Sequence, residues 1–268
     1  MIRTARARPV GWWHPVPGGS IDPDPRPGAS PPRRRSTVPD TAAATLEALL
    51  ARIDRARRDA GRVAPVRLLA VGKTHGAEAL AAVATAGQRA FGENYVQEAA
   101  GKIQALSGLG LEWHLIGHLQ SNKARQAAEV FDWVQTVDRR KLVDALAAHR
   151  PAARGPLNVL VQVNIDDESS KHGCRPEDVG ALVEAIRAAP SLRLRGLMAI
   201  PAPHPDPDAR RDAFVRMRRL FDLVAGADPG IDTLSMGMSD DLEVAVAEGA
   251  TMVRVGSALF GARPRVPR

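Results

Sequence analysis

The chain has 268 residues, 44% of them hydrophobic, which suits one barrel-sized domain or two smaller ones. Its net charge of +7 is concentrated at the start: residues 1–40 carry seven arginines and three aspartates, which leaves +3 for the rest. That distribution argues against a nucleic-acid partner. The single cysteine, Cys174, excludes an intramolecular disulfide and fits a reducing compartment. No apolar run approaches the roughly 20 residues that span a bilayer, so we expect a cytoplasmic protein with no membrane partner.

Residues 1–39 are rich in proline, glycine and arginine and show no periodicity. Such a segment buries too little apolar surface to offset its chain entropy, so we predict a disordered tail. Its basic start runs into proline and glycine instead of an apolar stretch, and we therefore predict no secretory signal. A basic arm for anionic partners around Arg33-Arg34-Arg35 is the alternative interpretation. One folded domain is predicted over residues 40–268.

From residue 41 onward, helical spacing alternates with short apolar runs. The first helix is predicted over residues 41–60, and it ends at Gly61, a typical helix terminator. Strands are predicted at 66–71, 89–91, 113–116, 133–137, 157–165, 193–200, 233–236 and 252–255. Helices are predicted between and after them at 77–86, 95–106, 122–130, 139–149, 176–189, 208–225, 240–248 and 257–260.

Eight strand–helix units are the number in a (β/α)₈ barrel, and several strands are apolar throughout, as in parallel sheets with both faces covered. A doubly wound open sheet is the competing fold, but it would carry a glycine-rich loop after its first strand. Here that turn is Gly72-Lys73-Thr74-His75-Gly76. The sequence therefore predicts an α/β fold: a single TIM-type barrel with one extra N-terminal helix.

Lys73 is the first candidate for chemistry among the five lysines of the chain. It ends the first predicted strand, where active sites of such barrels lie. A lysine that starts in an apolar wall is partly desolvated, which favours the uncharged amine that an aldehyde needs to form an imine. The alternative is a strand-end lysine whose ammonium simply extends to solvent.

Two loops at the other end of the chain have the character of a phosphate site. Residues 235–241 join the seventh predicted strand to its helix, and residues 254–261 run from the end of the eighth strand into the helix that follows it. Barrels often bind phosphate between these two loops, with backbone N–H groups as donors. Gly237 and Gly256 permit close approach, and Ser239 and Ser257 supply hydroxyls, although Ser239 could instead be only a helix N-cap. Because strands one and eight are neighbours in a closed barrel, the amine and the phosphate site would share one mouth.

Several segments together resemble the pyridoxal phosphate homeostasis protein family, or proline synthetase co-transcribed group, which is similar to the barrel domain of alanine racemases. They are 69–74 (LAVGKT), 91–98 (FGENYVQE), 113–123 (WHLIGHLQSNK), 163–165 (VNI), 173, 196–198 (GLM), 235–240 (SMGMSD) and 254–261 (RVGSALFG). The likeness covers residues 42–262. It departs from the family at Gly72, where serine is more usual, and in its long N-terminal extension.

The resemblance implies a site for pyridoxal 5′-phosphate (PLP) with Lys73 as the Schiff-base lysine. It implies phosphate contacts from Ser239, Gly256 and Ser257, and it places Asn94 and Met198 nearby. Arg254 would face either the pyridine nitrogen or the phosphate. Because an arginine does not readily give up its proton, facing the nitrogen it would keep that nitrogen unprotonated and make PLP a poorer electron sink.

The resemblance also bears on whether the protein is an enzyme. A racemase needs a second acid or base on the opposite face of the cofactor, which in alanine racemases is a tyrosine from a C-terminal domain. This chain ends seven residues after Gly261, and its one tyrosine is Tyr95. We therefore expect a carrier or buffer of PLP for client apo-enzymes, without robust turnover, as a monomer or weak dimer. A PLP-dependent racemase-like enzyme is the alternative.

Other polar residues are weaker candidates. His114 and His118 lie on a strand and its loop, not on one helical face, so they predict no metal site. Glu93 could act as a general base or anchor a neighbouring loop, and we favour the anchor. Cys174 lacks a neighbour that would lower its pKa, so we predict no catalytic role for it.

Overall fold

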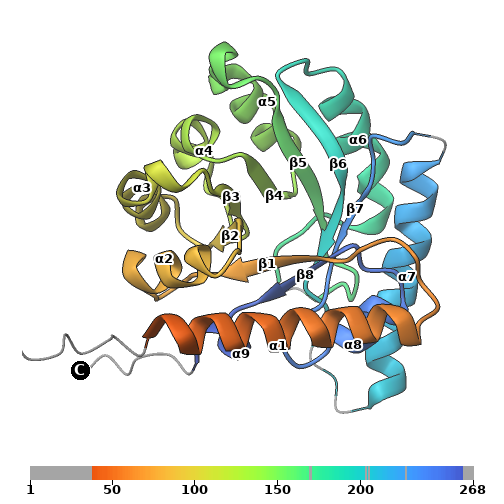
Figure 1. The fold of residues 1–268 in the computed structure, drawn as a ribbon. Coiled ribbons are helices and arrows are strands. Elements are labelled where there is room, and N and C mark those ends of the chain that lie inside the picture. Colours follow the sequence, from red (N-terminus) through yellow and green to blue (C-terminus); the bar gives the residue numbers. More distant parts are fainter. Residues whose placement is uncertain (1–37, 169–170, 203, 205, 227, 262–268) are drawn as a thin grey trace, which may run out of the picture. The chain divides into compact units, whose positions relative to one another are not determined.

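The structure is a computed structural model, and it describes residues 38–168, 171–202, 204, 206–226 and 228–261. The predicted tail over residues 1–39 lies almost entirely outside these ranges. In the described part, eight parallel strands pair in chain order and the last closes on the first, with helices around the outside (Figure 1). The predicted (β/α)₈ barrel is therefore confirmed.

The strands are short, as in most barrels of this class. They are β1 (Arg67–Val71), β2 (Ala90–Glu93), β3 (Glu112–Leu115), β4 (Trp133–Val137), β5 (Leu157–Val163), β6 (Leu192–Ala199), β7 (Thr233–Ser235) and β8 (Met252–Val255). The closing pair is parallel, with Leu69 opposite Arg254. This register brings the end of β1 beside the end of β8, as the site prediction required.

Helices follow every strand. They are α2 (Ala77–Thr85), α3 (Val96–Ala105), α4 (Ala124–Val130), α5 (Arg140–His149), α6 (Val179–Arg187), α7 (Pro207–Ala225), α8 (Leu242–Ala247) and α9 (Ser257–Phe260). Short 3₁₀ turns are η1 (Ser107–Leu109), η2 (Ser121–Lys123), η3 (Ala152–Arg154) and η4 (Pro176–Asp178). Two of these, η2 and η4, form the starts of what the sequence predicted as single helices.

The extra N-terminal helix is α1 (Val38–Asp59), which begins three residues before the predicted start. Its buried side consists of Leu46, Leu49, Ile53 and Ala56. It packs against α2, α8 and α9, along the side of the barrel where β8 meets β1 (Figure 1). None of the described helices combines the length and the apolar character needed to cross a membrane.

The bounds of two elements differ from the prediction because side chains redirect the backbone. Strand β5 stops at Val163 instead of residue 165, since the Asn164 side chain closes a turn by bonding both backbone groups of Glu168. Helix α8 begins at Leu242 instead of residue 240, because Asp241 accepts the N–H of Met238 at 2.6 Å and holds the preceding residues in a turn.

Side chains alternate between two apolar regions. Outward residues such as Leu68, Ala70 and Val253 belong to the large core between strands and helices. Inward residues form smaller groups inside the barrel, one around Leu69 and Val71. Since Lys73 is two residues beyond Val71, the alternation directs it to the interior face at the mouth of the barrel.

Candidate functional site

The carboxyl ends of the strands surround a cavity of about 230 Å³. Six of the seven predicted site residues line it: Lys73, Asn94, Ser239, Arg254, Gly256 and Ser257. Arg254 lies within β8, and the other five follow the ends of β1, β2, β7 and β8. The fold therefore brings together residues that lie up to 184 positions apart in the sequence.

Lys73 lies in a tight turn that follows β1. The N–H of Gly72 donates to the carbonyl of Gly92 on β2 at 3.0 Å, and the N–H of His75 donates back to the carbonyl of Gly72 at 3.1 Å. Thr74 has φ of 69°, a left-handed conformation that is uncommon for a residue with a branched side chain. The turn, with the strained residue Thr74 directly after Lys73, thus fixes the course of the backbone at the cavity wall.

A buried ammonium supports this turn from behind. Lys102 on α3 donates to the carbonyl of Gly72 at 2.9 Å, to Glu93 at 2.9 Å and to Glu98 at 2.7 Å. Glu98 in turn accepts the N–H of Thr74 at 3.1 Å. The backbone is therefore held on both sides of Lys73 by charged groups that do not line the cavity.

Glu93 is fully buried in this cluster, and its carboxylate faces Lys102 and not the cavity. It therefore helps to anchor the neighbouring turn, which is the role that the sequence favoured over that of a general base. Burial raises its pKa to about 7, although the Lys102 ammonium lowers it. The cluster also accounts for Gly72. A Cβ there would lie 2.6 Å from the Glu93 carboxylate and 2.9 Å from Leu80, so a larger residue would force the cluster to shift.

The predicted phosphate loops meet across the cavity. The hydroxyl oxygens of Ser239 and Ser257 are 3.3 Å apart. The described residues place no acceptor on the backbone N–H groups of Ser257 and Ala258. A Cβ on Gly256 would lie 3.1 Å from the carbonyl oxygen of Val71, which explains why glycine allows this loop to approach β1 so closely. Two hydroxyls and two N–H donors form a cradle that suits a phosphate, and Asp240 lines the same cavity beside it.

Ser239 is not the N-cap that the sequence left open as an alternative. Asp241 is the residue before α8. Ser239 is instead held through its carbonyl, which accepts from Arg52 of α1 at 3.0 Å. The same guanidinium pairs with Glu243 of α8 at 2.5 and 2.7 Å. The extra helix therefore braces the loop that carries one of the cradle hydroxyls.

Arg254 lies at the cavity floor with only 4% of its surface exposed. One terminal nitrogen donates to the carbonyl and hydroxyl oxygens of Ser235 at 2.7 and 2.8 Å, and the other donates to the carbonyl of Ala199 at 2.8 Å. Burial lowers the pKa of Arg254 to about 10, so it stays charged at neutral pH. Within the described part of the chain its Nε has no protein acceptor, which leaves an N–H for a bound group.

A chain of hydrogen bonds leads from Arg254 through the barrel interior. The Ser235 hydroxyl donates to Gln135 at 2.7 Å, the Gln135 amide contacts His114 at 2.9 Å, and His114 contacts Glu112 at 2.6 Å. Burial lowers the pKa of His114. Although burial raises the pKa of Glu112, hydrogen bonds from His114 and Arg67 hold it at about 2. His114 thus lies in a buried hydrogen-bond network inside the barrel, apart from the cavity that Lys73 lines.

A family model described as the N-terminal domain of alanine racemase matches residues 44–264. A protein of Pseudomonas aeruginosa named pyridoxal phosphate homeostasis protein is 54% identical over 224 residues, which cover 83% of this chain and 96% of the relative. This chain belongs to the pyridoxal phosphate homeostasis protein family.

Solved structures agree with this assignment. PipY of Synechococcus elongatus, solved with PLP bound, is 36% identical, with a TM-score of 0.70 over 82% of this chain and 100% of PipY. The alanine racemase of Corynebacterium glutamicum is 18% identical, with a TM-score of 0.63 over 84% of this chain and 62% of the racemase. At that identity the racemase shares the fold alone.

The remaining predicted residue of this family member, Met198, lies elsewhere. It is fully buried among Trp133 and Leu160 inside the barrel and does not line the cavity. Ile200, two residues later on the same face, lines the cavity instead. The pairing of β5 and β6 contains a register shift. Such a shift cannot be read from the sequence, so the sequence does not show which residue of this segment reaches the cavity.

Sequence reasoning also missed His75, which lines the cavity and stacks on Phe260 with ring centroids 4.9 Å apart. Burial, together with the nearby Lys102 charge, lowers its pKa. Its position two residues after Lys73 was the available signal.

Tyr95 is 67% exposed and lines a different cavity, together with His118. Cys174 is buried, and burial raises the pKa of its thiol to about 12.

Proposed function

We propose that this protein holds PLP as a Schiff base on Lys73 and acts in PLP homeostasis as a cytoplasmic carrier or buffer. One observation carries the proposal: Lys73 and the Ser239–Ser257 pair line the same cavity. A ligand with an aldehyde at one end and a phosphate at the other would engage both. The PLP in the solved structure of PipY supports this choice of ligand.

The residues divide the work of binding. When bound, PLP supplies an aldehyde that condenses with a primary amine, with loss of one water. The clamp formed by Lys102 and Glu98 orients the backbone from which Lys73 extends. The hydroxyls of Ser239 and Ser257 and the N–H groups of Ser257 and Ala258 would hold the phosphate. Asn94 lines this cavity and also a neighbouring one that His118 and His172 line.

We assign Arg254 to the pyridine nitrogen instead of the phosphate. Ser235 and Ala199 fix two of its nitrogens inside the barrel. Arg254 also lies two residues before Gly256 on β8, and therefore deeper in the barrel than the cradle. A charged N–H donor at the ring nitrogen would keep that nitrogen unprotonated and weaken PLP as an electron sink. This electronic effect favours storage and transfer to client apo-enzymes over turnover.

The test is reduction of the bound cofactor followed by peptide mapping. Borohydride treatment of protein incubated with PLP should fix the cofactor to a single peptide that contains Lys73. Lys73→Ala should abolish that adduct, while Lys123→Ala, which changes a lysine outside this cavity, should retain it. Labelling spread over several lysines, or unchanged in Lys73→Ala, would contradict the proposal.

A racemase-like enzyme is the second candidate, and the imidazole of His75 in the cavity favours it. Incubation with L-alanine and L-serine followed by chiral chromatography distinguishes the carrier from the racemase-like enzyme. The carrier proposal expects no robust conversion, together with transfer of PLP from the loaded protein to an apo-enzyme. Conversion at enzyme-like rates that disappears in both Lys73→Ala and His75→Gln would overturn it.

A further inference from the structure

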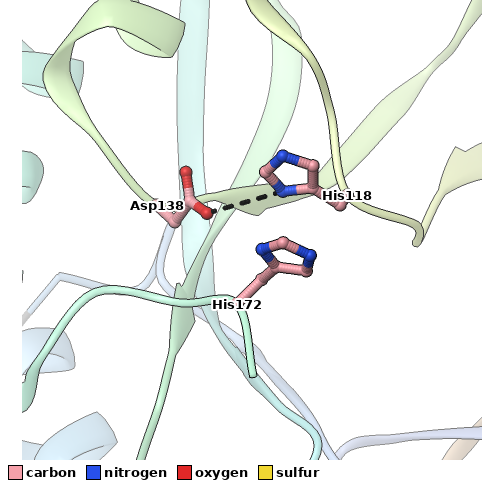
Figure 2. A group of neighbouring side chains, drawn as sticks. All are labelled: His118, Asp138 and His172. Carbon is pink, nitrogen blue, oxygen red and sulfur yellow. Dashed lines mark ion pairs between the residues drawn. The ribbon is translucent and has the colours of Figure 1, made fainter. Parts of the chain in front are cut away.

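Three polar side chains cluster at the ends of consecutive strands, beside the cavity described above. His118 lies three residues after β3, Asp138 directly follows β4, and His172 lies in the loop after β5. Figure 2 shows the two imidazole rings stacked, with the carboxylate of Asp138 directed toward their edge. The three ligand atoms all lie within 4.8 Å of one another. Residues from three separate segments of the chain thus converge on one point.

The carboxylate is held in place by a neighbouring residue. Arg139 donates to one oxygen of Asp138 at 2.6 Å and is itself anchored to the carbonyl of Leu119 at 2.9 Å. The other oxygen of Asp138 faces Nδ1 of His118 at 3.9 Å, which is too long for a hydrogen bond. The group therefore presents a carboxylate oxygen and a ring nitrogen separated by a gap.

We propose that His118, Asp138 and His172 form a binding site for a divalent transition-metal ion of the zinc class. Two imidazoles and one carboxylate are a ligand set that zinc and its neighbours in the first row accept. Magnesium and calcium prefer oxygen ligands throughout, so this set disfavours them. Three protein ligands leave one tetrahedral position for water or another small ligand.

The adjustment needed to close the site is small. Zinc bonds of about 2.0–2.1 Å place neighbouring ligand atoms about 3.3 Å apart. The 3.9 Å gap must therefore shorten by less than about 1 Å, and no separation within the group, at most 4.8 Å, must shorten by more than about 1.5 Å. The rings must also rotate out of their stack, in which they are 3.7 Å apart and inclined by 15°, because an imidazole binds metal in its own plane. Both histidines are exposed, so this rotation does not disturb the core.

Nearby charges set the strength expected of the site. The Arg139 guanidinium opposes a cation and makes the affinity moderate. Lys171 lines the cavity that His118 and His172 also line, but its ammonium is paired with Glu168 at 3.0 Å. That cavity shares Asn94, Ile116 and Ile200 with the cavity of Lys73. The open coordination position would therefore adjoin the candidate PLP site, although metal binding does not depend on PLP.

Titration of the full chain, without a polyhistidine tag and without PLP, tests the proposal. Zn²⁺ added in competition with a chromophoric chelator should bind at one ion per chain. His118→Gln and His172→Gln should each raise the dissociation constant at least tenfold. His149→Gln, at the end of α5 and outside the cluster, should leave it unchanged. Absence of stoichiometric binding, or an equal affinity in all four proteins, overturns the site.

Replacement by another zinc ligand distinguishes coordination from structural damage. His172→Cys should retain Zn²⁺ binding and, with Co²⁺ as the probe, add a thiolate-to-cobalt absorption band that the unaltered protein lacks. Cys174 is buried and does not supply this band in the unaltered protein. Lys73→Ala should bind Zn²⁺ normally, which separates this proposal from that of PLP binding. Loss of binding in His172→Cys, or no new band, counts against coordination by residue 172.

Discussion

Lys102 donates a 2.9 Å hydrogen bond from its ammonium to the carbonyl oxygen of Gly72. Gly72 is the residue directly before the candidate Schiff-base lysine, so a charge on α3 fixes the peptide that delivers Lys73 to the cavity. The same ammonium bonds Glu93 and Glu98, and only 7% of Lys102 is exposed. A buried charge shared among three acceptors is costly to remove, because it leaves carboxylates without compensation.

Replacement of Lys102 by methionine should therefore lower both stability and PLP occupancy. We expect Lys102→Met to reduce the free energy of unfolding by about 3–5 kcal/mol, the usual cost of breaking a buried ion pair by removing one partner. The turn at Gly72 should loosen as well, which lowers the yield of borohydride-fixed PLP in protein that is still folded. Urea denaturation and the reduction assay measure the two effects.

The matched control for this change is Lys141→Met, since Lys141 is an exposed lysine on α5. It should change the free energy of unfolding by less than about 0.5 kcal/mol, as surface substitutions do. Similar losses in both variants would show that the Lys102 cluster contributes nothing specific.

Glu93 should make the stability depend on pH in an unusual direction. Burial raises its pKa from the ordinary value of 4.5 to about 7 in the folded protein. Between these values the folded state binds a proton that the unfolded state does not, so the stability from Glu93 is complete below pH 4.5 and is lost as the pH rises through about 7. The loss amounts to at most about 3 kcal/mol.

The variant Glu93→Gln isolates this contribution from the other titrating groups. Unfolding free energies from urea titrations at half-unit steps between pH 4.5 and 8 should fall less steeply in Glu93→Gln than in the unaltered protein. His114, whose lowered pKa acts in the opposite sense, is present in both proteins and cancels in the difference. Parallel curves would mean that Glu93 titrates normally.

The sequence predicted the parts of this site that follow from strand order and alternation. Lys73, Ser257 and Arg254 lie at ends of neighbouring strands, and the barrel rule alone brings them together. The support of Lys73 could not be predicted in the same way. Lys102 contacts a carbonyl 30 residues away, and a lysine within a helix gives no indication that it points into the core. Likewise, His118 and His172 are 54 positions apart in loops whose course depends on the packed structure.

Arg254 can be assigned to the ring nitrogen or the phosphate by comparing PLP with pyridoxal, which lacks the phosphate. Arg254→Lys loses the fork that bridges Ser235 and Ala199, so it should weaken PLP binding at least tenfold. If Arg254 faces the nitrogen, pyridoxal binding should weaken by the same factor. Ser257→Ala is the complementary control, because a cradle residue should affect PLP and leave pyridoxal unchanged. Loss of PLP binding alone in Arg254→Lys would transfer this residue to the phosphate.

The brace between the extra helix and the cradle predicts an effect from a residue outside the cavity. Arg52 holds the carbonyl of Ser239 at 3.0 Å and pairs with Glu243, and both partners of that ion pair are partly exposed. An exposed ion pair contributes up to about 1 kcal/mol. If all of this free energy goes into positioning the cradle loop, Arg52→Ala should weaken the affinity for PLP roughly fivefold and leave the affinity for pyridoxal unchanged. The effect should shrink at high salt, because an exposed pair is screened. Arg55→Ala removes an exposed arginine from the same helix and serves as the control. Equal PLP affinities in the two variants would show that α1 packs against the barrel without positioning the cradle loop.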